Sequence, residues 1–222
     1  MVFSSAIFLY WFLPFTFLIY HMMSNNKCKN IILTIASLVF YAFGQIQYLP
    51  LLLFSVFCNY LFGLLLSENT SHKKRKYIII LALFVNITLL CVFKYTDFFI
   101  VCLNSILHTN IPITGITLPI GISFFTFQGI SYVVDVYRNQ KEGTKDFLKV
   151  LLYISFFPQL IAGPIIKYHD ISMQIDNRVC TLKQTAEGFR RFIVGLSKKL
   201  LLSNTMGLLA DSVFALSETE LD

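Results

Sequence analysis

Residues 167–170 place an amine, a phenol, an imidazole and a carboxylate side by side, directly after an apolar stretch that proline and glycine interrupt. The interruptions are Pro158, Gly163 and Pro164. Lipid offers backbone groups no hydrogen-bond partner, so a helix broken at membrane depth must pack in protein or line a wet cavity. The pattern therefore predicts a functional site at a broken segment, or else an ordinary span followed by a solvated loop.

The composition is typical of a polytopic membrane protein. Of 222 residues, 56% are hydrophobic and only 14% are charged, and several apolar runs approach the ~20 residues that cross a bilayer. We expect an all-α, polytopic transmembrane protein in which residues 1–222 form a single membrane domain. The net charge of +6 does not indicate a nucleic-acid partner, because the basic residues lie in short loops between apolar runs. The five cysteines lack metal-ligand spacing, so no metal site is expected.

The apolar runs predict the membrane spans and their orientation. We expect spans at 2–23, in two helices within 31–66 joined by an uncharged turn at 44–47, at 77–93 and at 118–137. The short run 98–107 predicts a half-helix or an interfacial segment. The basic loops 24–30 and 67–76 are two spans apart, so both can face the cytoplasm, which places the N-terminus outside.

A full crossing by residues 147–166 would put the basic residues of 167–191 outside the cell, against the positive-inside tendency. We therefore expect a re-entrant path, for which the proline and glycine positions supply the turn. Residues 188–202 combine an apolar stripe with four basic residues. This pattern predicts an amphipathic helix at an anionic membrane surface, or simply a positive flank of the next span.

Two motifs are the most distinctive, LPIGISFFTFQ at 118–128 and PQLIAGPI at 158–165. Together with weaker stretches in the same order, they resemble the membrane-bound O-acyltransferase family, in its alginate O-acetyltransferase-like branch. The resemblance covers essentially the whole chain and implies the N-terminal part of that fold, truncated at the C-terminus. The family's proposed catalytic histidine lies in a later segment beside Trp and Arg, and the one tryptophan here is Trp11. No catalytic residue is therefore expected within this chain, which should be inactive alone.

The resemblance also implies a function. We expect transfer of acetyl groups to an exported, alginate-like polysaccharide, with acetyl-coenzyme A or another acyl thioester as donor and no bound cofactor. It implies a bacterial inner-membrane location and a periplasmic or extracellular partner that relays the acyl group. The alternatives are D-alanyl transfer toward teichoic acid, a non-catalytic fragment, and a polysaccharide or lipid transporter.

The candidate site residues form two sets. The first could line a substrate tunnel, although each side chain could instead bond within or between helices or be solvated: Ser123, Gln128, Gln159, Tyr168 and His169. The second could contact an anionic donor or the membrane interface: Lys167, Arg190, Arg191, Lys198 and Lys199.

Overall fold

The computed structural model describes residues 3–68, 71–161 and 163–216. Every regular element in these ranges is a helix, which confirms the all-α prediction. Three helical stretches are long and apolar enough to cross a membrane: Asn26–Glu68, His72–Leu107 and Leu182–Phe214. The described residues divide into two compact units, one of residues 14–178 and one of residues 3–13 and 179–216. The single membrane domain stays a prediction, and each unit is described by itself.

The predicted helical pair within residues 31–66 is confirmed as α2 (Asn26–Gln45) and α3 (Leu49–Glu68). A short 3-10 helix, Ile46–Tyr48, separates them at the expected turn. The Asn25 side chain accepts a hydrogen bond from the Lys27 amide at 2.9 Å, so α2 begins inside the predicted loop 24–30. Each helix has 20 residues, which at ~1.5 Å per residue is about the thickness of the hydrocarbon core.

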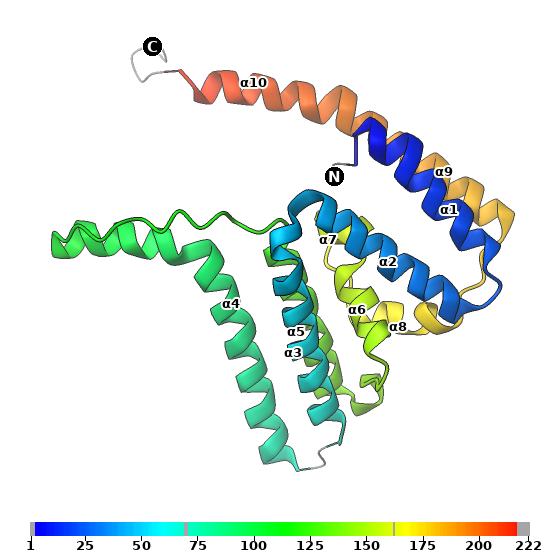
Figure 1. Ribbon diagram of the computed structural model, residues 1–222, viewed down its shortest axis with the longest axis horizontal. Coiled ribbons are helices and arrows are strands. Elements are labelled where there is room, and N and C mark those ends of the chain that lie inside the picture. The colour runs from blue at the N-terminus through cyan, green and yellow to red at the C-terminus, as the bar shows by residue number, and fades with distance from the viewer. Residues whose placement is uncertain (1–2, 69–70, 162, 217–222) are drawn as a thin grey trace. The chain divides into compact units, whose positions relative to one another are not determined.

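Helix α4 (His72–Leu107) corrects one prediction, because its 36 residues form one helix and not a span with a separate segment at 98–107. Polar side chains in the last part of the helix are satisfied without ending it. The Asp97 carboxylate accepts a hydrogen bond from the Thr114 amide at 2.9 Å. The Asn104 side chain bonds both the amide and the carbonyl of Ile111, each at 2.9 Å. Residues 108–120 therefore run back beside the last part of α4. Figure 1 shows that α4 itself bends before this last part.

Helix α5 (Ile122–Arg138) packs on α3 and α4 and on the later helices of the first unit. It begins after Gly121, whose φ of 72° suits glycine, and it confirms the predicted span at 118–137 apart from its first turn. Glycines bring α3 and α5 together, since a Cβ on Gly63 would collide with Tyr132 and one on Gly129 with Asn59. Small residues at such contacts let membrane helices approach closely.

A buried amide pair joins α3 to α4. The Asn59 and Asn86 side chains donate to each other's oxygens at 3.1 and 2.9 Å, and both are almost fully buried. Each amide also donates to a carbonyl four residues earlier in its own helix. The pair thus satisfies polar groups that would be costly in an apolar interior.

Apolar and amphipathic helices make up the described part of the second unit. A π-helix, Phe8–Phe12, leads into α1 (Leu13–Met22), which lies mostly in the first unit. The apolar helix Phe8–Met22 is shorter than the ~20 residues of a span, and residue 2 of the predicted span 2–23 lies outside the described ranges. A capping box of Thr181 and Gln184 starts α9 (Leu182–Ser197), which continues through Lys198–Ser203 into α10 (Asn204–Phe214).

Candidate site at the re-entrant segment

The broken segment forms two short helices and then returns. Helix α6 (Phe147–Ser155) is followed by the single turn α7 (Phe157–Leu160) and, after residues 161 and 163–167, which are not helical, by α8 (Tyr168–Asp176). Lys149, near the start of α6, pairs with Asp176 at the end of α8 at 2.7 Å. His169 in α8 pairs at 3.2 Å with Glu142, which precedes α6. The chain therefore returns to the end of the unit from which α6 departs, as the re-entrant prediction requires.

The length of α6 supports the same reading. Its nine residues rise only ~14 Å, about half the ~30 Å of the hydrocarbon core. Three hydrogen bonds satisfy groups that the break sets free. The Phe157 amide donates to the Ser37 hydroxyl at 3.2 Å, the Tyr153 hydroxyl to the Ile166 carbonyl at 2.7 Å, and the Gln159 side chain to the Tyr153 carbonyl at 2.9 Å. The broken backbone is thus braced by protein groups.

The two predicted basic loops and α8 gather at one end of this unit. Asn26 donates to the Asp176 carbonyl at 2.8 Å, and Arg75 donates to the Tyr137 carbonyl at the end of α5. At the other end, Gln45 accepts from the Ile120 amide at 2.7 Å. Loop 24–30 and the described part of loop 67–76 thus lie at one end of the unit, and the turn 44–47 lies at the other end. Two spans between the basic loops imply this arrangement. Which end faces the cytoplasm stays a prediction.

Three tyrosines pack where α5, α6 and α8 meet. The Tyr168 ring contacts Tyr132 and Tyr153 edge-on, with centroids 4.8 and 5.1 Å apart. Tyr168 is 3% exposed, and this burial raises the pKa of its phenol above the usual range. The cluster anchors the start of α8 with neutral side chains.

His169 is exposed but held in place from two directions. Its ring nitrogen Nδ1 lies 3.2 Å from Glu142 Oε1, and its backbone amide donates to Asp135 Oδ2 at 3.2 Å. The Ser172 hydroxyl donates to the other Glu142 oxygen at 3.3 Å. An imidazole held through Nδ1 has its second nitrogen available to a proton or a ligand.

The remaining tunnel candidates differ in their surroundings. Gln159 bonds within the re-entrant segment, while Gln128 is 1% exposed and both of its amide atoms lack a hydrogen-bond partner among the described residues. Ser123 is five residues from Gln128 on α5, which at ~100° per residue puts it on a different face of the helix. The structure therefore brings Tyr168, His169 and Gln159 to the re-entrant segment and leaves Ser123 apart from Gln128.

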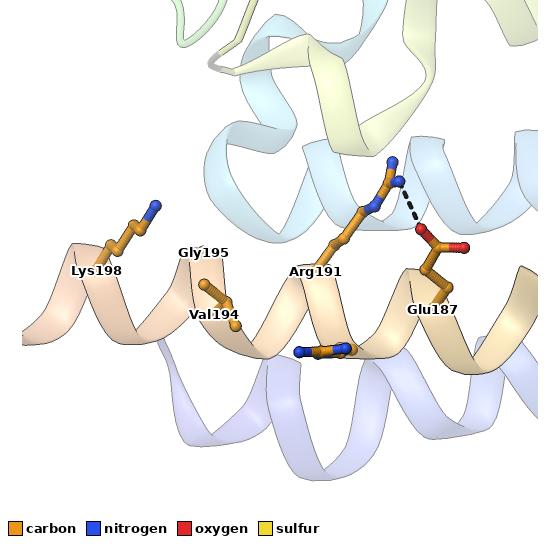
Figure 2. A pocket seen from close by; sticks show the side chains of 6 residues that line it. Glu187, Arg191, Val194, Gly195 and Lys198 are labelled. Atoms are coloured by element: carbon orange, nitrogen blue, oxygen red, sulfur yellow. Dashed lines mark hydrogen bonds and ion pairs between the residues drawn. The ribbon is translucent and has the colours of Figure 1, made fainter.

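The candidates for anionic contact fall in both units. Lys167 immediately precedes α8 in the first unit. In the second unit, a surface pocket of about 340 Å3 lies on α9 and the first residue of the π-helix that follows, and Figure 2 shows the side chains that line it. Its lining residues are Glu187, Arg190, Arg191, Val194, Gly195 and Lys198. Glu187 neutralises part of this charge, since it pairs with Arg191 at 2.6 Å. Within the described residues, no three His, Cys, Asp or Glu side chains are grouped to hold a metal ion.

Sequence reasoning missed several residues that shape this region. Asn59 and Asn86 stand inside apolar runs, and a polar residue at such a position is a signal that could have identified them. Nothing in the sequence indicates that Glu142 and Asp135 contact His169, because both residues are far from His169 along the chain.

The fold and site thus define a helical membrane protein with a braced re-entrant segment. Curated relatives match this architecture along nearly the whole chain. A protein of Pseudomonas aeruginosa named "Probable alginate O-acetylase AlgI" is 38% identical in an alignment that covers 97% of this chain and 42% of the relative. A protein of the same name from Azotobacter vinelandii is 37% identical over 98% of this chain and 44% of its own length. The "Peptidoglycan O-acetyltransferase" of Helicobacter pylori is 34% identical over 96% of this chain and 46% of its own length.

These relatives confirm the predicted resemblance to membrane-bound O-acyltransferases of the alginate branch. The chain spans less than half the length of the curated relatives it matches. No family model matches the chain, and no solved structure matches it.

Proposed function

We propose that this chain is part of a membrane O-acetyltransferase that acetylates a cell-surface polysaccharide. The observation that carries the proposal is the 34–38% identity to proteins named as O-acetylases or an O-acetyltransferase along almost the entire chain. The braced re-entrant segment is compatible with it, because non-helical backbone at membrane depth is tolerated next to a cavity. The transporter alternative lacks such support, since both kinds of relative are named for acetyl transfer.

The chemistry sets what the intact enzyme needs. Transfer to a sugar hydroxyl requires a base for that hydroxyl and donors for the developing oxyanion. By the resemblance, the base is a histidine in a later segment. The re-entrant segment would then border the path of the acyl group, with Gln128, Gln159, Tyr168 and His169 as its candidate contacts.

The proposed donor is acetyl-coenzyme A or another acyl thioester from the cytoplasm. Coenzyme A carries several negative charges, so we place its arrival at the end of the unit that holds the basic loops and Lys167. This assignment puts the protein in the inner membrane with its N-terminus outside. The acceptor lies across the membrane, so a relay partner on that side belongs to the same proposal.

The test is deletion of the gene in its own organism, followed by measurement of base-labile acetate released from the cell-surface polysaccharides. We expect the loss of most of this acetate and its return on complementation with the gene. Analysis of separated alginate-like and peptidoglycan fractions identifies the acceptor. Unchanged acetate in every fraction would contradict the proposal.

A further inference from the structure

We propose that Gln128 binds a group of the ligand that both donates and accepts a hydrogen bond, an amide or a hydroxyl, between α5 and the returning segment 163–167. The proposal rests on the proposed function for the identity of that ligand. It assigns to Gln128 a direct contact and not the helix-bridging role that its position in an apolar helix would suggest.

The first argument is the face of α5 on which Gln128 lies. Gln128 and Asp135 are spaced seven residues apart within α5, which is about two helical turns, so they lie on one side of the helix. At the N-cap of this helix, a Cβ on Gly121 would lie 2.5 Å from the Leu160 carbonyl of α7, so the start of α5 lies close to α7. At the other end, Asp135 accepts from the His169 amide of α8 at 3.2 Å. Gln128 therefore faces the described residues between 160 and 169, most of which are not helical.

The second argument is the state of the amide itself. The Gln128 side chain is 1% exposed, and neither its nitrogen nor its oxygen has a hydrogen-bond partner among the described residues. Other buried amides of this unit are paired, as Asn59 is with Asn86 and Gln159 with the Tyr153 carbonyl. A buried polar group without a partner is strongly unfavourable. A ligand that forms the missing hydrogen bonds would explain why an amide occupies this position.

The third argument concerns which chemical groups can form hydrogen bonds with both polar atoms of the Gln128 amide. An amide oxygen needs a donor and an amide nitrogen needs an acceptor. One secondary amide or one hydroxyl supplies both, whereas a carboxylate or a phosphate only accepts. In the proposed reaction, secondary amides are present in the pantetheine arm of the donor, and hydroxyls in the sugar acceptor.

The test compares Gln128→Met with Gln159→Met, because both replace a buried glutamine by an apolar side chain of similar length. The first measurement is thermal unfolding of the full chain in detergent. Gln159→Met removes a bond and should lower the Tm. Gln128→Met removes an uncompensated amide and should raise the Tm, by about 2–4 °C. A comparable fall in both variants would show that Gln128 is bonded within the protein, and the proposal would be wrong.

The second measurement is the Tm shift caused by two probes, S-acetylpantetheine and a mannuronate oligosaccharide. We expect one of them to raise the Tm of the unsubstituted chain and to have little effect on the Tm of Gln128→Met. The probe that does so identifies whether the bound group belongs to the donor or to the acceptor. If neither probe shifts the Tm, or if the shift persists in Gln128→Met, the amide holds at most water and the inference is overturned.

The third measurement is surface O-acetylation in cells that carry Gln128→Met in place of the natural gene, where we expect a drop of at least ~10-fold. Normal acetylation in this variant would contradict the inference. If gene deletion itself leaves acetylation unchanged, the proposed function fails, while the two Tm measurements still decide the role of Gln128. The two failures are therefore distinguishable.

Discussion

Asn59 and Asn86 offer the clearest energetic test at the scale of single residues. Their side chains are the buried link between α3 and α4, with reciprocal bonds of 3.1 and 2.9 Å. We expect Asn59→Ala and Asn86→Ala each to destabilise the chain, because each leaves a buried partner unsatisfied. The double variant should cost less than the sum, by a coupling of about 0.6–1.7 kcal/mol. Unfolding of the four proteins in mixed micelles measures this cycle, and strictly additive effects would contradict the pairing.

Individual residues also show where sequence patterns stop being informative. Both Gln128 and Gln159 stand in apolar surroundings in the sequence, which favours hydrogen bonding between helices over substrate contact for each. In the structure Gln159 is bonded to the Tyr153 carbonyl and Gln128 has no described partner. The difference depends on which neighbours fold against each helix face, so the two roles could not be separated from the sequence.

Glycines set the contact of α3 with α5 at the scale of elements. Gly129→Ala would push a methyl group into the Asn59 side chain, which is held by its pairing with Asn86. We expect this variant to lower the Tm of the chain in detergent. The matched control is Gly188→Ala in α9, where a Cβ meets nothing within 4 Å. This control should gain stability, by up to ~1 kcal/mol, because alanine favours helices. A Gly129→Ala chain as stable as the control would refute the close contact.

The re-entrant path makes a second prediction at this scale. Cysteines at positions 74 and 169 should react from the same side of the membrane, and a cysteine at position 46 from the opposite side. The reason is that α8 and the start of α6 lie at one end of the unit, joined by the Lys149–Asp176 pair. Labelling of intact cells with an impermeant maleimide, after replacement of the five natural cysteines, checks the pattern.

We expect an impermeant reagent outside the cell to reach position 46 alone. Strong labelling at position 74 would overturn the proposed orientation. Labelling of 169 together with 46 would instead mean that residues 147–166 cross the membrane fully.

At the scale of the whole molecule, we predict that the 222-residue chain by itself has no acetyltransferase turnover. Acyl transfer without a positioned base should lose about two to four orders of magnitude in rate, and the resemblance places that base in a later segment. Purified chain would be given acetyl-coenzyme A and an oligosaccharide, and free thiol release would be measured. Turnover that His169→Ala abolishes would show that this chain carries the chemistry.

Most of the fold could be predicted from the sequence, and the part that could not was a matter of distant contacts. The hairpin of α2 and α3, helix α5 and the break at Pro158 follow from apolar length and from proline and glycine positions. The sequence predicts a span at 77–93 and a separate segment at 98–107, whereas α4 is one helix in which the returning residues 111–114 satisfy the side chains of Asp97 and Asn104. A polar residue in an apolar run ends a helix or finds a partner, and only the packing distinguishes these outcomes.

The sequence by itself determined the class of protein, the number and approximate limits of most helices, and the resemblance to O-acetyltransferases. It could do so because lipid forces each spanning segment to satisfy its own backbone, which ties apolar length directly to helices. Only the tertiary structure decided that α8 returns beside the start of α6, that His169 pairs with Glu142, and that Gln128 is buried without a partner among the described residues. These features depend on side chains far apart in the chain, whose meeting is set by the packing of several helices at once.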